Sequence, residues 1–325
     1  MNTNTHNSLF APLYVWHVAL VTQRIDECVS RFWTDFGVGP WQFVRFDFKE
    51  EDARIFGRPQ ALSVQAAITQ VGFLTLGFDQ PMNSPNPYSE MIEARGGGAH
   101  HLAFAVADEE AARRQMQALG HNELLAADRI GPAGDGQATY FDTRDALGTY
   151  IELSKVPPEL PPLGRVFPVS GQTRNSTFTV GGTSHIVIAV RDLDPAVPNF
   201  ERMLGVGPWK IETRQAPVRY RGSSQVYAAR TATAIAGSYV IVLEQPLTSA
   251  GPIYDFLEQF GQGIHRISFL VDSLAAAEQE LANRGYKLLF KVLDSNNPES
   301  TEAVVLDSER LVGVTLELRE RAVSA

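Results

Sequence analysis

The sequence predicts an α+β fold made of four βαβββ units that form two mixed sheets, and three observations support this. A long internal repeat divides the chain into two similar halves. Within each half, apolar runs typical of strands twice surround an amphipathic segment typical of a helix. A proline-rich stretch separates the halves. With 325 residues, 44% of them hydrophobic, each half is long enough to bury a core.

The repeat is recognised by the pentapeptide Gly-Val-Gly-Pro-Trp at residues 37–41, which returns 168 positions later. His17 and His185 precede the two copies by the same spacing, so the beginnings of the halves align at this offset. Near the ends of the halves, Glu152 and Glu317 align at an offset of 165 residues. A net deletion of three residues therefore relates the second half to the first.

Each half contains the same order of elements. A strand is followed by an amphipathic helix that ends at the first glycine of the pentapeptide, since glycine commonly ends helices. Strand-like runs, a glycine-rich loop and a second round of strand, helix and strands follow. Besides that helix, the segments of the first half are 13–21, 61–78, 95–99, 101–106, 109–119 and 150–153. Those of the second half are 184–190, 225–243, 261–263, 266–271, 274–284 and 314–318.

The boundary between the halves is predicted at residues 156–162, which read Val-Pro-Pro-Glu-Leu-Pro-Pro. Because proline lacks a backbone N–H, this stretch cannot supply a regular hydrogen-bond ladder and suits a stiff connector. The predicted organisation is an N-terminal tail at 1–12, a first domain at 13–155, a proline-rich linker at 156–179 and a second domain at 180–325.

The composition excludes several classes of protein. Lys and Arg number 28 against 37 Asp and Glu, and the formal charge of -9 argues against a surface that binds nucleic acid or acidic membranes. No stretch reads as a secretion signal or a membrane span. Cys28 is the only cysteine, which excludes an internal disulfide, and its place in a helical apolar pattern predicts a buried packing residue. We therefore expect a cytoplasmic protein.

Three residues of the first half have the chemistry of metal ligands. His17, His101 and Glu152 each lie on a predicted strand. Two imidazoles and one carboxylate form the facial set that binds a divalent ion and leaves positions open to substrate, oxygen or water. Open positions are typical of a catalytic rather than a structural metal site.

Strand alternation distinguishes His101 from the histidine that precedes it. His101 shares its strand face with two alanines, which leave space in front of it. His100 shares the opposite face with Leu102, Phe104 and Val106. We therefore expect His100 to be directed towards packing and His101 to face an open space.

Three stretches of the first half, together with the βαβββ repeat, resemble the vicinal oxygen chelate superfamily. They are Trp16-His17-Val18-Ala19, His100-His101-Leu102-Ala103-Phe104 and Thr149-Tyr150-Ile151-Glu152-Leu153. This superfamily contains glyoxalase I, methylmalonyl-CoA epimerase, fosfomycin resistance proteins and type I extradiol dioxygenases. The resemblance implies two cupped sheets and a small-molecule substrate. It also implies that His17, His101 and Glu152 bind one divalent ion per chain, whether Fe, Mn, Co, Ni or Zn.

The branch that the sequence resembles most is the methylmalonyl-CoA epimerase-like one. Residues 140–148 lead to Glu152 with the longer turn of that branch, not with the short proline-containing turn of extradiol dioxygenases. The resemblance therefore favours proton chemistry over ring cleavage. Glu152, Asp79 and Tyr140 are the candidate catalytic residues, the last two as groups that transfer protons.

One departure from that branch concerns a fourth metal ligand. Epimerases and glyoxalases usually supply a Gln or Glu four residues before a proline, on the last strand of the first unit. Gly77 occupies this position here, before Pro81. We therefore expect three protein ligands, unless Asp79 or Thr75 on the same strand face reaches the ion.

The second half has lost the set of ligands. His185 and Glu317 persist, but Arg266 occupies the position of the second histidine and Val242 that of the fourth ligand. A guanidinium stays protonated and cannot bind a cation, so we predict a bidentate Arg266–Glu317 pair in the place of the ion. A metal bound through His265 is the less favoured alternative, because a shift of one residue turns a side chain to the opposite face. We expect this half to be structural or to act as a lid.

Two enzymatic functions and one binding function fit these features. The first is glyoxalase- or epimerase-type isomerisation or lyase chemistry on a substrate that chelates the metal through vicinal oxygens. The second is ring cleavage by an Fe(II)-dependent dioxygenase. The third, which the intact triad disfavours, is a resistance-type protein that sequesters its ligand. A homodimer is compatible with all three.

Aromatic residues are frequent in the first unit of the first half. They predict an aromatic or apolar substrate and an ordinary core equally well. These residues are Phe43, Phe46, Phe48, Phe56, Phe73 and Phe78.

Overall fold

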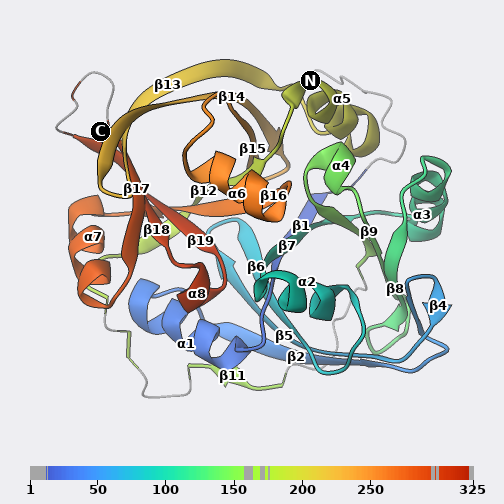
Figure 1. Cartoon of the computed structure of the whole chain (residues 1–325). Coiled ribbons are helices and arrows are strands. Elements are labelled where there is room, and N and C mark those ends of the chain that lie inside the picture. The colour runs from blue at the N-terminus through green and yellow to red at the C-terminus, as the bar shows by residue number, and fades with distance from the viewer. Residues whose placement is uncertain are drawn as a thin grey trace, which may run out of the picture.

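The computed structural model describes residues 12, 14–156, 164–168, 173–174, 176–293, 297 and 300–321. Most of the predicted tail and part of the predicted linker, residues 157–163 included, lie outside this description. Two mixed sheets, one from each half, dominate the fold, and helices pack around them (Figure 1). The predicted α+β architecture of four βαβββ units in two sheets is confirmed.

The first half forms one continuous open sheet. In sheet order its strands are β11 (Val166–Phe167), β2 (Trp41–Phe48), β5 (Leu62–Val71), β6 (Leu74–Pro81), β1 (Tyr14–Val21), β7 (Gly98–Ala105), β10 (Tyr150–Lys155), β9 (Gly136–Phe141), β8 (Glu123–Ile130), β3 (Ala53–Ile55) and β4 (Arg58–Pro59). β1 and β7, the first strands of the two units, are antiparallel neighbours in the middle of the sheet. β11, which lies within the predicted linker, extends one edge, and the β3–β4 hairpin extends the other.

The second half closes into a barrel. Its strands, in sheet order, are β12 (Val180–Ala189), β15 (Tyr239–Pro246), β14 (Ser223–Ala236), β13 (Lys210–Tyr220), β17 (Lys287–Leu293), β18 (Thr301–Asp307), β19 (Thr315–Glu320) and β16 (Gly263–Val271). β13 pairs with β17 and joins the two units, with Val218 opposite Val292. Closure removes the free strand edges that the first sheet retains.

The helices of the described chain are α1 (Ile25–Phe36), α2 (Pro87–Arg95), α3 (Glu109–Ala118), α4 (Arg144–Leu147), α5 (Leu193–Leu204), α6 (Pro252–Phe260), α7 (Leu274–Asn283) and α8 (Glu309–Val312). α1 and α5 both end at the first glycine of the repeated pentapeptide, as predicted. Gly37 has a φ of 66° and Gly205 a φ of 63°, a left-handed conformation that glycine adopts without steric cost. None of these helices combines the length and apolar character needed to cross a membrane.

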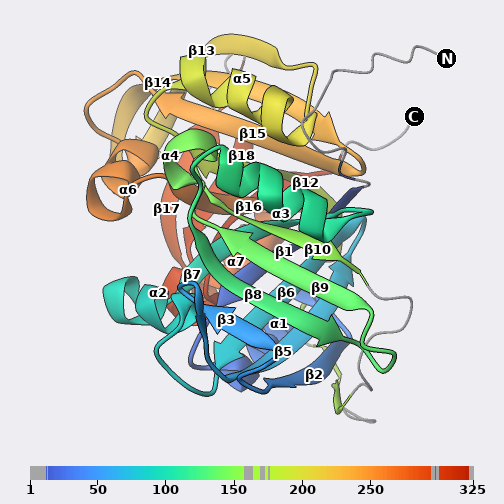
Figure 2. The same ribbon diagram turned by 90° about the vertical axis from the view of Figure 1, so that its right-hand side faces the viewer.

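The largest hydrophobic core lies between the two halves and is shared by both. Phe32 on α1 contacts Phe269 on β16, with ring centres 6.3 Å apart. Figure 2 shows the second sheet above the first, with α4 close to α5 at their border, where Asn199 donates a hydrogen bond to the carbonyl of Ala146. Cys28 is buried in this core, as predicted. A shared core fixes the position of each half relative to the other.

Candidate metal centre

His17, His101 and Glu152 lie on the adjacent strands β1, β7 and β10. Ala103 on β7 pairs with His17 on one side and with Glu152 on the other. His101 lies two residues before Ala103, and residues two apart on a strand point to the same face. Sheet pairing therefore brings the three side chains together on one face, although they are far apart in the sequence.

The three side chains direct one atom each towards a common point. Nε2 of His17 lies 3.2 Å from Nε2 of His101 and 3.5 Å from Oε2 of Glu152. Nε2 of His101 lies 2.8 Å from the same carboxylate oxygen. Ligands bound at about 2.1 Å lie about 3.0 Å apart at right angles and about 3.4 Å apart at tetrahedral angles. The observed separations are close to these values, so the set fits a divalent ion.

The protonation states also suit a metal ion. Burial lowers the pKa of His17 to about 4, against the opposing effect of Glu152, so this imidazole is neutral at pH 7. Burial opposes ionisation of Glu152, but the two imidazoles and a hydrogen bond from Ser154 outweigh it and lower the pKa of Glu152 to about 2. Oε2 of Glu152 is buried, 2.8 Å from Nε2 of His101 and 3.5 Å from Nε2 of His17. A neutral imidazole and an ionised carboxylate are ligand types that a divalent cation binds.

A β-bulge sets the position of the preceding histidine. Ala19 and Leu20, neighbours on β1, pair with His101 and Ala99 on β7. His100 is therefore an extra residue without a partner on β1. A bulge redirects side chains from strict alternation, so the face expected for His100 no longer follows from the sequence.

His100 is buried, as expected, and aromatic rings lie against it. Its ring stacks on Tyr150 and contacts Tyr88, with ring centres 4.7 and 5.2 Å away. Nδ1 of His100 lies 2.9 Å from Nδ1 of His101. When Nε2 of His101 faces an ion, its Nδ1 carries the proton and donates a hydrogen bond to Nδ1 of His100, which orients the ring. The predicted burial of His100 is confirmed, and the aromatic rings in contact with it are those of Tyr150, Tyr88 and His101.

The triad lies at a cavity of about 110 Å³ inside the first sheet. His17 and Glu152 line it, and most of its other walls are apolar. Of the six phenylalanines considered above, Phe46 and Phe48 line the cavity. Phe43 and Phe78 belong to the core, and Phe56 and Phe73 are exposed. Two of these six phenylalanines, Phe46 and Phe48, therefore contribute to the cavity wall, and the other four do not line it.

Both remaining catalytic candidates, Asp79 and Tyr140, line the same cavity. Burial raises the pKa of Asp79 to about 7, although His101 opposes this shift. The ring of Tyr140 meets that of His101 edge to face, with centres 4.9 Å apart. Tyr88, on α2, also lines the cavity and packs edge to face against Tyr140. Sequence reasoning missed Tyr88, because α2 was not predicted.

The position of the usual fourth ligand is open. Gly77 lines the cavity, and a Cβ atom built on it would lie 4.0 Å from Cδ2 of His17. Asp79 and Thr75 line the cavity on the same strand, but Asp79 does not belong to the close group formed by the triad. The hydroxyl of Thr75 accepts a hydrogen bond from Gln70 instead. The expectation of three protein ligands thus agrees with the positions of these side chains.

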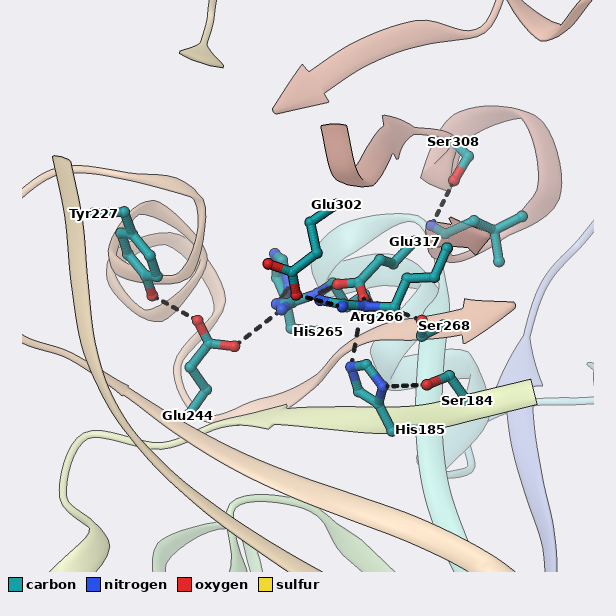
Figure 3. Close-up of polar contacts among 12 residues, drawn as sticks. Ser184, His185, Tyr227, Glu244, His265, Arg266, Ser268, Glu302, Ser308 and Glu317 are labelled. Atoms are coloured by element: carbon teal, nitrogen blue, oxygen red, sulfur yellow. Dashed lines mark hydrogen bonds and ion pairs between the residues drawn. The ribbon is translucent and has the colours of Figure 1, made fainter. Parts of the chain in front are cut away.

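In the second half, a cluster of charged residues occupies the equivalent place (Figure 3). Nε of Arg266 donates to Glu317 at 2.6 Å, and Nη2 donates to Glu244 at 3.0 Å. His185 lies 3.5 Å from Glu317. The predicted Arg266–Glu317 pair is confirmed, but it is not bidentate, because the guanidinium bridges two carboxylates. Nη1 of Arg266 lies 3.2 Å from Nδ1 of His265.

Glu244 is the member of this cluster that sequence reasoning missed. The offset of 165 residues relates it to Asp79, and the pairing of Glu244 with Ala189 repeats that of Asp79 with Val21. Glu244 also accepts a hydrogen bond from Tyr227 at 2.8 Å. The repeat itself was therefore the signal that could have identified this residue.

Comparisons with known proteins agree with this geometry. A family model described as Glyoxalase/Bleomycin resistance protein/Dioxygenase superfamily matches residues 16–141 and 184–299. The uncharacterized protein YqjC of Bacillus subtilis (strain 168) is 32% identical over 105 residues, which are 32% of this chain and 68% of that protein.

Two solved structures extend the comparison. A triple mutant of 4-hydroxymandelate synthase from Streptomyces coelicolor has a TM-score of 0.63 at 16% identity, covering 97% of this chain and 94% of that one. Methylmalonyl-CoA epimerase from Mycobacterium tuberculosis is 26% identical over 47% of this chain and 95% of its own, with a TM-score of 0.36. The first similarity shows that the fold extends over nearly the whole chain. The matched segments cover more than half of the residues, and the chain belongs to the glyoxalase, bleomycin resistance protein and dioxygenase superfamily, the vicinal oxygen chelate superfamily.

Proposed function

We propose that this chain is a metal-dependent isomerase or lyase of the glyoxalase and epimerase type. The observation that carries the proposal is that two members of the triad, His17 and Glu152, line a cavity that Asp79 also lines, a carboxyl group suited to proton transfer. His17, His101 and Glu152 hold one divalent ion per chain. Such an ion draws electrons from vicinal oxygens of a substrate and stabilises the negative charge that develops as a proton leaves.

Asp79 is the proton acceptor in this proposal. With a pKa near 7, its carboxyl group takes up and releases a proton readily at neutral pH. It lies on β6, opposite Val21 of β1, and its side chain lines the cavity. Burial raises the pKa of Tyr140 well above its usual value, so this hydroxyl stays protonated and donates a hydrogen bond to substrate oxygen.

The walls of the cavity indicate the class of substrate. Phe46 and Phe48 lie side by side with nearly parallel rings, and Leu62 and Val64 extend the same apolar surface. Among the described residues that line the cavity, Lys155 alone carries a basic side chain, and Lys155 is exposed to solvent. A small molecule with an apolar or aromatic body and two adjacent oxygens fits this surface. A multiply charged anion would find no buried cation here to pair with.

Metal content tests the proposal directly. Elemental analysis of the purified chain should find one divalent ion per chain. His17→Ala and His101→Ala should lose it, because each removes one of three ligands. His185→Ala is the matched control, since this histidine occupies the position of His17 in the second half. Retention of near-stoichiometric metal in both first-half variants would contradict the assignment.

An Fe(II)-dependent ring-cleaving dioxygenase is the second candidate function. The observation that favours it is the set of two histidines and one carboxylate beside the open position at Gly77, which leaves coordination sites for oxygen and substrate. Oxygen uptake distinguishes the two functions. We expect the iron-loaded protein to convert its substrate without consuming oxygen. Uptake of one oxygen molecule per product would assign the reaction to the second candidate.

A further inference from the structure

Tyr239 belongs to the second half but lies against the strands of the first that form the metal centre. It is the first residue of β15, next to the turn that joins β14 to β15, and it is 6% exposed. The tip of this hairpin contacts the first half: a Cβ atom built on Gly237 would lie 4.0 Å from Cβ of Tyr14 on β1. The hairpin thus extends across the border between the halves.

The phenol oxygen of Tyr239 bridges two strands of the other half. It accepts a hydrogen bond from the backbone N–H of Thr75 on β6 at 2.9 Å, and it donates one to the backbone carbonyl of Trp16 on β1 at 3.3 Å. The parallel pairing of β1 with β6 begins further along, at Val18 and Leu76. The hydroxyl group therefore links the strands where their own ladder is absent.

This bridge lies next to a metal ligand. Trp16 precedes His17 and is the bulged residue of β1, since Val15 pairs with Phe104 and His17 pairs with Ala103. A bulge leaves backbone groups without ladder partners and makes the strand easier to distort. The hydrogen bond from Tyr239 satisfies the carbonyl of this bulge and holds it in place. On the other strand, the side chain of Thr75 lines the cavity.

Among the described residues, the corresponding hairpin of the first half has no side chain that bridges β12 and β15. A single, longer hydrogen bond of 3.5 Å runs there from the hydroxyl of Thr183 to the carbonyl of Val71. The offset of 165 residues relates Tyr239 to Leu74, which is buried and has no hydroxyl group. The hairpin tip at Gly72 instead lies against the backbone of Gly182 on β12. The hydroxyl bridge is thus found beside the intact triad and not beside Arg266. This asymmetry associates the bridge with the metal centre rather than with the packing that both halves share.

We propose that Tyr239 is a positioning residue for the metal centre, through which the second half holds His17 in place. The proposal rests on the assignment of the metal to His17, His101 and Glu152. It gives the second half a role in the reaction, although its own site holds Arg266 instead of a second histidine. Tyr239 does not contact the ligand atoms, so its effect is on the position of β1 and of the imidazole that β1 carries.

The test compares two buried tyrosines that both link the halves. Tyr239→Phe removes only the bridging hydroxyl group. Tyr286→Phe is the control, because its hydroxyl donates to Asp35 of α1 at 2.8 Å and does not contact the triad or the cavity. Each variant is stripped with chelator and titrated with Co²⁺, and the visible spectrum and the melting temperature are recorded. Tyr239→Leu, which copies Leu74, repeats the test with a second side chain.

Loss of the bridge should weaken Co²⁺ binding about ten-fold, the lower end of the effect of losing an outer partner of a metal ligand. It should also change the Co²⁺ spectrum, which a general loss of stability does not do. Tyr286→Phe should lower the melting temperature while it leaves affinity and spectrum unchanged. Affinity within two-fold of wild type in both Tyr239 variants, or an equal loss in Tyr286→Phe, overturns the positioning role alone. Equal Co²⁺ binding by wild type and His101→Ala overturns the metal assignment and this inference together.

Discussion

Arg266→Ala tests whether a guanidinium takes the place of the metal ion in the second half. Arg266 is 6% exposed and contacts Glu317 and Glu244, which are 0% and 5% exposed. Its removal leaves two buried carboxylates without the cation between them. Glu317 retains a hydrogen bond from Arg319 at 2.5 Å, and Glu244 retains one from Tyr227 at 2.8 Å.

The expected loss of stability follows from these contacts. Breaking a buried ion pair on one side costs about 3–5 kcal/mol, because the remaining charge is stranded. Two carboxylates lose their partner here, but the hydrogen bonds that remain compensate part of the cost, so we expect a loss within this range. With an unfolding entropy of about 2.1 cal/mol/K per residue over the chain, the melting temperature should fall by about 4–7 °C.

Calorimetry at pH 7, with metal analysis of the same samples, is the appropriate assay. Arg191→Ala is the control, because its ion pair with Glu258 is largely exposed and should contribute less than about 1 kcal/mol. Metal content should be unchanged in both variants. An Arg266→Ala protein that melts within about 1 °C of wild type at about pH 7 would refute the reasoning, because a loss of about 3–5 kcal/mol should lower the melting temperature by about 4–7 °C.

The pH dependence gives a second check. The pKa of Glu317 lies well below its usual value, because Arg266 and the imidazole of His185 outweigh the effect of burial. A carboxyl group whose pKa is lower in the folded than in the unfolded chain stabilises the fold at any pH above its unfolded pKa, which is about 4.3 for glutamate. This stabilisation is lost as the pH falls from there towards the folded pKa. The variant lacks most of this contribution. The difference in stability between wild type and Arg266→Ala should therefore persist down to about pH 4 and narrow as the pH falls further below that value.

Three further predictions concern the metal centre and its counterpart. Asp79→Asn should lower turnover by about 10²–10⁴-fold and leave the metal content unchanged. The turnover of wild type should rise with pH through about 7, because Asp79 loses its proton there. A turnover that does not change with pH would contradict the role of Asp79 as the base. Gly77→Gln should tighten Co²⁺ binding, because a Cβ atom there meets only ordinary contacts, and weaker binding would show that the position is not directed at the ion. Arg266→His should raise metal content from one to two ions per chain, measured by elemental analysis, because it completes a triad with His185 and Glu317; unchanged content would show that these side chains do not converge on an ion.

The sequence by itself determined the repeat, the strands that carry the triad and the degeneracy of the second half. These depend on information that is local or periodic along the chain. The shared spacing predicted that Arg266 lies where a histidine stands in the first half. The pair of Arg266 with Glu317 followed because strands related by a repeat pair in the same way.

Tertiary structure alone decided the features that depend on contacts between distant segments. The bulge at His100 changes its neighbours, and a bulge depends on how two strands pair rather than on one residue. The near-neutral pKa of Asp79 depends on its burial among several strands of the first sheet. Tyr239 reaches Trp16 across 223 positions of the chain, and only the packing of the two halves brings them together. Local sequence patterns do not predict contacts between such distant segments, because these contacts depend on how the hydrophobic residues of both halves pack together.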